Sequence, residues 1–269
     1  MASWLGIVGF RRHPIVAACL CTAAIVAWIV LGTSALDGIA STDTRLFVRD
    51  GMVRWPLAAL LLVALFRLRG HWELSTLGRP QRPTRLPWAT IALTVGCLIL
   101  AAPLTQFWTD GSYTAAVLLS EMATGVFEEL GFRGLIFCGL VTGLGRTHQR
   151  VRLAMYLSCA LFGLAHGFAG IGAVVVTAVL GALFLASTLE LQSLWPAAIL
   201  HGLLDVGVNG PDLAPAGVDE TWGETFLIAG DLVLFAASIA SLIAFALWRS
   251  WPIIGAATGE RSSPEDEMR

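Results

Sequence analysis

The chain has 269 residues, of which 56% are hydrophobic and only 13% are charged, and its mean hydropathy is +0.74. This composition excludes an ordinary soluble domain, in which about a quarter of the residues are charged. The formal net charge of −2 gives no indication of a nucleic-acid partner. We therefore predict an all-α membrane protein, because a helix pairs its backbone polar groups within its own segment.

Eight apolar segments follow one another along the chain, and most approach the length that a membrane-spanning helix requires. In chain order they cover residues 15–36, 55–66, 86–104, 115–140, 151–166, 171–189, 194–208 and 226–248. They predict a polytopic membrane helix bundle of about eight transmembrane helices. The fifth and seventh segments are short for full spans, so we expect them to be tilted or to end at a cavity.

The basic residues predict the orientation of the chain. The sequence contains no lysine, and most of its arginines fall at the ends of segments that share one side of the membrane. The opposite loops contain only Arg45, Arg49 and Arg54, so the positive-inside rule places both termini in the cytoplasm. Because arginine without lysine is typical of a GC-rich bacterial genome, we expect a bacterial cytoplasmic membrane. We expect one domain over residues 1–255, with its motif core at 121–208, and a disordered cytoplasmic tail at 256–269.

One predicted span carries an unusual cluster of ionisable residues. Its sequence GVFEELGFRGLIF covers residues 125–137 and contains Glu128, Glu129 and Arg133. Each ionised side chain at the centre of a membrane helix costs roughly 2.5 to 3.5 kcal/mol, so the helix requires polar partners. Glu129 and Arg133 are four residues apart and can pair with each other. Glu128 has no such partner in its own helix and must find one on another helix, in water or in a proton.

Two histidines and an aspartate lie inside other apolar segments. His166 ends the fifth segment, while His201 and Asp205 are one helical turn apart in the seventh and share a face. A single histidine of this kind is more often a packing residue, but these groups together with Glu128 favour a shared polar site. Glu121 and Asp231 are weaker candidates because they lie near predicted helix ends, where such side chains can snorkel or cap.

These residues resemble the three motifs of the CPBP intramembrane proteases, which include CAAX-processing prenyl endopeptidases and bacteriocin-processing or abortive-infection-type proteins. Glu128, Glu129 and Arg133 match EExxxR, Phe162 and His166 match FxxxH, and His201 and Asp205 match HxxxN or HxxxD. The stretch LQSLWPAAILHGLLD, residues 191–205, is also similar to the approach to the family's last motif. Residues 1–110 and the last predicted helix match no motif of the family.

The resemblance implies an intramembrane endopeptidase that acts on a membrane-associated peptide or protein. In that case Glu128 and His166 activate a water molecule, and His201 and Asp205 bind the oxyanion or position the water. Glu129, Arg133 and Phe162 support the site or engage substrate. Burial in an apolar bundle makes a carboxylate a stronger base, which suits peptide hydrolysis at neutral pH.

The sequence is compatible both with a zinc-dependent site and with a metal-free one. His166, His201 and Asp205 could ligate zinc together with a glutamate, but the chain has no HExxH motif to favour that assignment. An aspartate at 205 suits a metal or a charged histidine, whereas a protonated aspartate would donate a hydrogen bond as asparagine does.

Two other classes of protein would also bury such residues. A proton-coupled transporter places Glu, His, Asp and Arg in a membrane cavity, usually with inverted repeats and interrupted helices. A non-catalytic immunity or scaffold protein descended from a protease would tend to lose some site residues. We detect no clear repeat, and every motif position is filled, so the sequence favours the protease.

Overall fold

The computed structural model describes residues 9–36, 43–68, 77, 86–101, 111–212 and 220–247. The described residues form α2 (Pro14–Ala35), α3 (Asp43–Leu68), α4 (Trp88–Ala101), α5 (Gly111–Glu129), the π-helix η3 (Leu130–Phe137), α6 (Cys138–Leu144), α7 (His148–Ala165), the 3₁₀-helix η4 (Gly167–Ala169), α8 (Ile171–Leu191), α9 (Trp195–Asp212) and α10 (Glu220–Leu247). No strand occurs among them, which confirms the predicted helix bundle.

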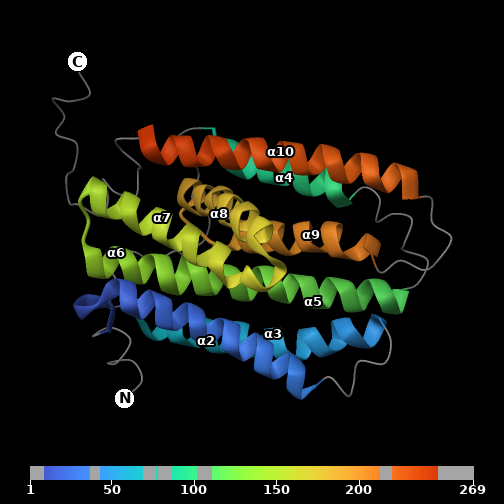
Figure 1. The fold of residues 1–269 in the computed structure, drawn as a ribbon, viewed down its shortest axis with the longest axis horizontal. Coiled ribbons are helices and arrows are strands. Elements are labelled where there is room, and N and C mark those ends of the chain that lie inside the picture. The colour runs from blue at the N-terminus through green and yellow to red at the C-terminus, as the bar shows by residue number, and fades with distance from the viewer. Residues whose placement is uncertain are drawn as a thin grey trace.

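The helices pack side by side along one long axis, with α5 near the centre (Figure 1). Helices α2 and α3 lie on one side of α5, and α4 and α10 lie on the other (Figure 1). Helix α5 makes its most extensive contacts with α9 and α3, while α8 packs against α7 and α10. The motif-bearing helices therefore occupy the interior of the bundle.

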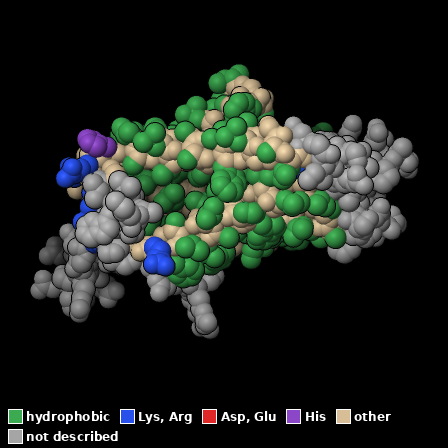
Figure 2. Space-filling model, turned by 90° about the horizontal axis from the view of Figure 1, so that it is seen from below, with side chains coloured by type: hydrophobic (Ala, Val, Ile, Leu, Met, Phe, Trp, Pro, Cys, Tyr) green, Lys and Arg blue, Asp and Glu red, His purple; other side chains and the backbone are tan. Residues whose placement is uncertain are grey.

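The outer faces of the bundle are apolar, as a lipid environment requires. Four described helical stretches are long and apolar enough to cross a membrane: Pro14–Ala35, Val48–Leu68, Ile171–Leu191 and Ile228–Leu247. Large apolar side chains such as Leu31, Leu232 and Leu247 project outward from them. Figure 2 shows one such face covered by hydrophobic side chains, with arginine and histidine side chains gathered at one end.

The second predicted segment was too short at its start. It was expected over residues 55–66, with an earlier start left open and with Arg45, Arg49 and Arg54 in a loop. Helix α3 does start earlier, at Asp43, and contains all three arginines. Local pairing explains how charged residues join the helix. Asp50 contacts the guanidinium groups of Arg49 at 2.8 Å and Arg54 at 3.4 Å.

The fourth predicted segment is interrupted by a π-helix that hydropathy did not reveal. The helical run continues from Gly111 to Leu144, but its central Leu130–Phe137 stretch has wider turns. Within it, the carbonyl of Phe132 accepts a hydrogen bond from the Ser158 hydroxyl at 3.1 Å, and that of Arg133 accepts one from the Cys138 thiol at 3.3 Å. Such segments frequently occur at functional sites.

The short fifth segment ends where a cavity begins. Helix α7 stops at Ala165, His166 caps it, and η4 leads to Gly170 with φ of +96° before α8. A positive φ of this kind favours glycine, and it reverses the chain sharply between α7 and α8. The side chain of His166 lines the cavity described below. Of the two alternatives expected for this short segment, a tilt or an end at a cavity, the position of His166 agrees with the second.

The predicted tail at 256–269 lies outside the described residues, as does most of the connection between α3 and α4. The single-domain assignment over residues 1–255 stays a prediction.

Candidate active site

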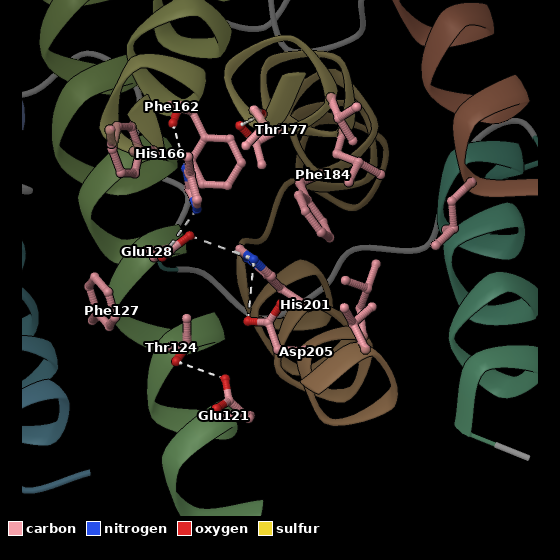
Figure 3. Close-up of a pocket in the computed structure, with 18 of the residues that line it drawn as sticks. Glu121, Thr124, Phe127, Glu128, Phe162, His166, Thr177, Phe184, His201 and Asp205 are labelled. Carbon is pink, nitrogen blue, oxygen red and sulfur yellow. Dashed lines mark hydrogen bonds and ion pairs between the residues drawn. The ribbon is translucent and has the colours of Figure 1, made fainter. Parts of the chain in front are cut away.

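The three sequence motifs meet at one place inside the bundle (Figure 3). Glu128 and Glu129 end α5, Arg133 lies in η3, and Phe162 and His166 lie at the end of α7. His201 and Asp205 project from one face of α9, with His201 Nε2 3.7 Å from Asp205 Oδ2. Helices far apart in the chain therefore bring together every site residue that the sequence predicted.

Glu128 faces two histidines on other helices. One carboxylate oxygen lies 3.9 Å from His166 Nε2, and the other lies 3.6 Å from His201 Nε2. Figure 3 shows the carboxyl group of Glu128 between the two imidazole rings. Both separations are longer than a hydrogen bond, so the three side chains face a common space and do not hydrogen-bond to one another directly. Of the alternatives expected for Glu128, the structure shows residues of other helices facing it.

Glu129 and Arg133 form the ion pair that their spacing predicted. Glu129 Oε1 lies 3.1 Å from Arg133 Nη1, and both side chains are almost fully buried. The same oxygen lies 3.1 Å from His201 Nδ1. The carboxyl group of Glu129 thus pairs with Arg133 and accepts a hydrogen bond from His201, which fixes the orientation of the imidazole ring.

The hydrogen bonds also decide which nitrogen of each histidine faces Glu128. His166 Nδ1 lies 2.9 Å from the carbonyl oxygen of Phe162, which can only accept, so Nδ1 carries the proton. His201 Nδ1 carries a proton for the same reason, because Glu129 accepts from it. Both histidines therefore present Nε2 to the space beside Glu128.

The Nε2 atom of His201 faces two carboxyl groups at once, those of Glu128 and Asp205. Two carboxylates facing one imidazole nitrogen favour a protonated, positively charged ring over a neutral one. A protonated Nε2 can donate a hydrogen bond to a group in the cavity.

Aromatic rings hold both histidines in place. Phe184 of α8 stacks on His201, with ring centroids 4.2 Å apart and an interplanar angle of 20°. Phe162 meets His166 edge to face at 4.9 Å and lies beneath the Arg133 guanidinium, 4.4 Å from its Cζ atom. Sequence reasoning found Phe162 through its motif but missed Phe184, because a phenylalanine within an apolar helix carries no distinguishing signal.

A cavity of about 810 Å³ contains this site and extends along the bundle. Apolar side chains of α2, α8 and α10 supply much of its wall, and Glu128, His166, His201 and Asp205 project into it (Figure 3). Three further ionisable residues also line the cavity: Arg54, Glu121 and Asp231. The cavity therefore combines an apolar lining with a few convergent polar groups, as ligand sites do.

The expectation that Glu121 snorkels or caps a helix end was wrong. Its side chain is buried and lies 3.3 Å from Arg54 Nη1 and 3.3 Å from the hydroxyl of Thr124. Arg54 also donates to Ser120 at 2.8 Å. Glu121 thus belongs to a network that ties α3 to α5, which the sequence could not show because the partner arginine was assigned to a loop.

The possible zinc ligands His166, His201 and Asp205 do not form a ligand set in this structure. Among the described residues, no three His, Cys, Asp or Glu side chains are arranged to hold one metal ion. His166 and His201 are instead directed at Glu128, and Asp205 at His201. No step proposed below uses a metal.

Residues 110–207 match the family model of the Rce1-like type II CAAX prenyl endopeptidases. The match contains all three motifs, and it confirms the resemblance to the CPBP proteases. It spans α5 through most of α9 and excludes α2, α3, α4 and α10. No curated protein and no solved structure matches the chain.

The Rce1-like match supports a coarse functional statement. Its family consists of proteases, so the chemistry expected of residues 110–207 is hydrolysis of peptide bonds, with a peptide or protein as substrate. Together with the four apolar spans, it indicates an intramembrane endopeptidase in general.

Proposed function

We propose that this protein is an intramembrane endopeptidase in which Glu128 activates the attacking water. The observation that carries the proposal is the position of Glu128, a buried carboxyl group facing His166 and His201 from across the bundle. General-base catalysis requires a base within reach of a water molecule next to the scissile carbonyl group. The space between Glu128 and the two Nε2 atoms is where such a water would sit.

His166 is suited to orient that water. Its Nδ1 proton is held by the Phe162 carbonyl, so the lone pair of Nε2 is free to accept a hydrogen bond from the water. Glu128 then takes the second proton as the water oxygen attacks the carbonyl carbon. The resulting tetrahedral intermediate collapses with cleavage of the C–N bond, and Glu128 returns its proton to the leaving amine.

His201 and Asp205 are suited to stabilise the oxyanion of that intermediate. A proton on His201 Nε2 or on Asp205, whose Oδ2 lies 3.7 Å from Nε2, would provide a donor for the oxyanion. His201 is held in position before substrate arrives. Glu129 accepts a hydrogen bond from it, Phe184 stacks on its ring, and Arg133 pairs with Glu129. A donor fixed in advance costs no reorganisation when charge develops, which is the main advantage of a preorganised site.

We propose a substrate that is itself associated with the bilayer, in a bacterial cytoplasmic membrane. The cavity lies among membrane-spanning helices, and apolar residues such as Ile29 of α2 and Phe235 of α10 line it. An apolar wall favours a lipidated or hydrophobic segment over a free polar peptide.

Reconstituted protein tests the proposal. Purified protein in liposomes would be given two quenched fluorogenic peptides, one ending in a farnesylated Cys-aliphatic-aliphatic-X sequence and one anchored by a transmembrane segment. We expect cleavage of at least one probe by the wild type, and none by the His201→Ala variant recovered at equal yield. Cleavage of neither probe by folded wild-type protein would contradict the proposal, and equal cleavage by His201→Ala would contradict the role of His201.

A further inference from the structure

The backbones of α5 and α9 approach each other closely at two glycines, Gly125 and Gly202. A methyl group added to Gly125 would meet the carbonyl oxygen of Ala198 and the backbone nitrogen of Gly202, and would lie 2.9 Å from Gly202 Cα. A methyl group on Gly202 would lie 2.8 Å from Met122 Cα and 3.0 Å from the carbonyl oxygen of Glu121. The obstructing atoms are mainly backbone, so they cannot turn aside as a flexible side chain can.

This contact lies within one helical turn of the active-site groups on both helices. Gly125 precedes Glu128 by three residues and Glu129 by four, and Gly202 directly follows His201. The α5–α9 contact is also the most extensive helix pair in the described structure. The distance between the two backbones at this point therefore fixes how closely Glu128 and Glu129 approach His201.

We infer that Gly125 and Gly202 are positioning residues for catalysis, an inference that rests on the function proposed above. The two glycines allow α5 and α9 to approach closely enough for the 3.1 Å contact between Glu129 Oε1 and His201 Nδ1 and the 3.6 Å separation of Glu128 from Nε2. A side chain at either glycine separates the helices by roughly an ångström, and a displacement of about that size can lower a rate by about a hundredfold.

The test compares Gly125→Ala and Gly202→Ala with Gly143→Ala. Gly143 is an equally crowded control, because an added methyl group would meet the carbonyl oxygen of Phe10 and lie 2.6 Å from Pro14 Cβ. It lies in α6, about 20 Å along the helical run from Glu128, and it does not line the cavity. Each variant would be assayed in liposomes with the fluorogenic probe that wild-type protein cleaves, well below its own unfolding temperature.

We expect Gly125→Ala to lower kcat by about ten- to a hundredfold while KM changes less than about twofold, because binding is retained and the reacting groups are displaced. Gly202→Ala should have a smaller effect of the same kind, since its added methyl group is less crowded. Gly143→Ala should keep wild-type kcat even where its unfolding temperature falls. If the substitutions acted only by lowering stability, kcat of Gly143→Ala would fall together with that of Gly125→Ala and Gly202→Ala.

Equal kcat in all three variants, or a rise in KM at unchanged kcat, would overturn the inference. If Gly125→Ala does not fold, the milder Gly202→Ala decides by the same criterion. Glu128→Gln separates this inference from the proposed function. Activity in Glu128→Gln would contradict the function itself, whereas an inactive Glu128→Gln beside a fully active Gly202→Ala would contradict only the positioning role.

Discussion

Arg133 is a fully buried guanidinium whose charge is balanced entirely within the protein. It pairs with Glu129 at 3.1 Å, donates to the Gly181 carbonyl at 2.9 Å and lies against the rings of Phe162 and Phe184. Glu129 in turn holds His201. A structural ion pair and the orientation of a catalytic group thus depend on the same carboxylate.

We predict that Arg133→Met or Glu129→Gln alone lowers the free energy of unfolding by about 3 to 5 kcal/mol, because each leaves its partner without its counter-charge in the interior. The double variant should recover much of that stability, since it removes both charges. It should stay inactive because a neutral amide in place of the Glu129 carboxylate cannot hold a charged His201. Thermal unfolding and cleavage assays check the two halves of this prediction, and single variants with unchanged stability would contradict the ion-pair assignment.

Residue 205 allows a test of whether the hydrogen-bond donor to the oxyanion requires the negative charge of the Asp205 carboxylate. Its Oδ2 lies 3.7 Å from His201 Nε2, close enough to share a proton through small adjustments but too far for a direct hydrogen bond. Asparagine keeps the shape of the side chain and can donate through its amide, which suits an oxyanion.

We therefore predict that Asp205→Asn keeps activity within about tenfold of the wild type. A tenfold loss corresponds to a rise of about 1.4 kcal/mol in the activation free energy. Chelators should not inhibit either protein. Stoichiometric zinc in active wild-type protein, lost together with activity in Asp205→Asn, would contradict this account and favour a metal-dependent site.

The sequence predicted the residues that the fold brings together at the candidate site, but not all the contacts among them. Spacing was sufficient for the Glu129–Arg133 pair and for the shared face of His201 and Asp205, because both lie within one helical turn. The stacking of Phe184 on His201 joins α8 to α9. It depends on the rotation of each helix about its own axis, which hydropathy does not encode.

At the scale of elements, the network around Arg54 joins the first half of α3 to α5. Arg54 contacts Asp50 in its own helix and Ser120 and Glu121 across the interface. The arginine side chain keeps 18% of its surface exposed, whereas that of Glu121 keeps only 4%. The pair is therefore intermediate between a surface ion pair and a buried one.

We predict that Arg54→Met destabilises the protein by about 1 to 3 kcal/mol, because it leaves the Glu121 carboxylate buried without its cation. Arg12→Met is the matched control. Its side chain is exposed at the start of the bundle, so the free energy of unfolding should change by less than about 0.5 kcal/mol. Equal effects of the two substitutions in thermal unfolding would contradict a stabilising α3–α5 network.

Helix boundaries show which elements the sequence could predict. All eight predicted segments correspond to helices, since long apolar runs are a strong signal. The start of α3 was missed because its arginines and Asp50 pair only once the helix has formed. The π-helix was missed because hydropathy and spacing do not distinguish it from an α-helix; one carbonyl within it, that of Phe132, accepts a hydrogen bond from Ser158 of α7.

At the scale of the whole molecule, neighbouring helices of the bundle pair with charged side chains that a single membrane-spanning helix would leave exposed to lipid. The start of α2 and the end of α10 lie at the same end of the bundle as the start of α7 (Figure 1). Exposed Arg11, Arg12 and Arg150 lie at this end, which supports the proposal that it faces the cytoplasm.

Reporter fusions test this orientation. We predict that green fluorescent protein fused after residue 269 fluoresces in a bacterial host, and that alkaline phosphatase fused at the same position is inactive, because the phosphatase requires export. An active phosphatase fusion would reverse the proposed topology. It would leave the geometry within the bundle unchanged.

The measurement that tests the central claim most directly is the turnover rate of Glu128→Gln in liposomes, with the probe that wild-type protein cleaves. Glutamine keeps the size of the side chain and removes the base, so the variant should insert and unfold like the wild type. The account predicts a fall in kcat of about a hundredfold or more, the usual contribution of a general base. A kcat near that of the wild type would contradict the assignment of Glu128 as the base that activates water.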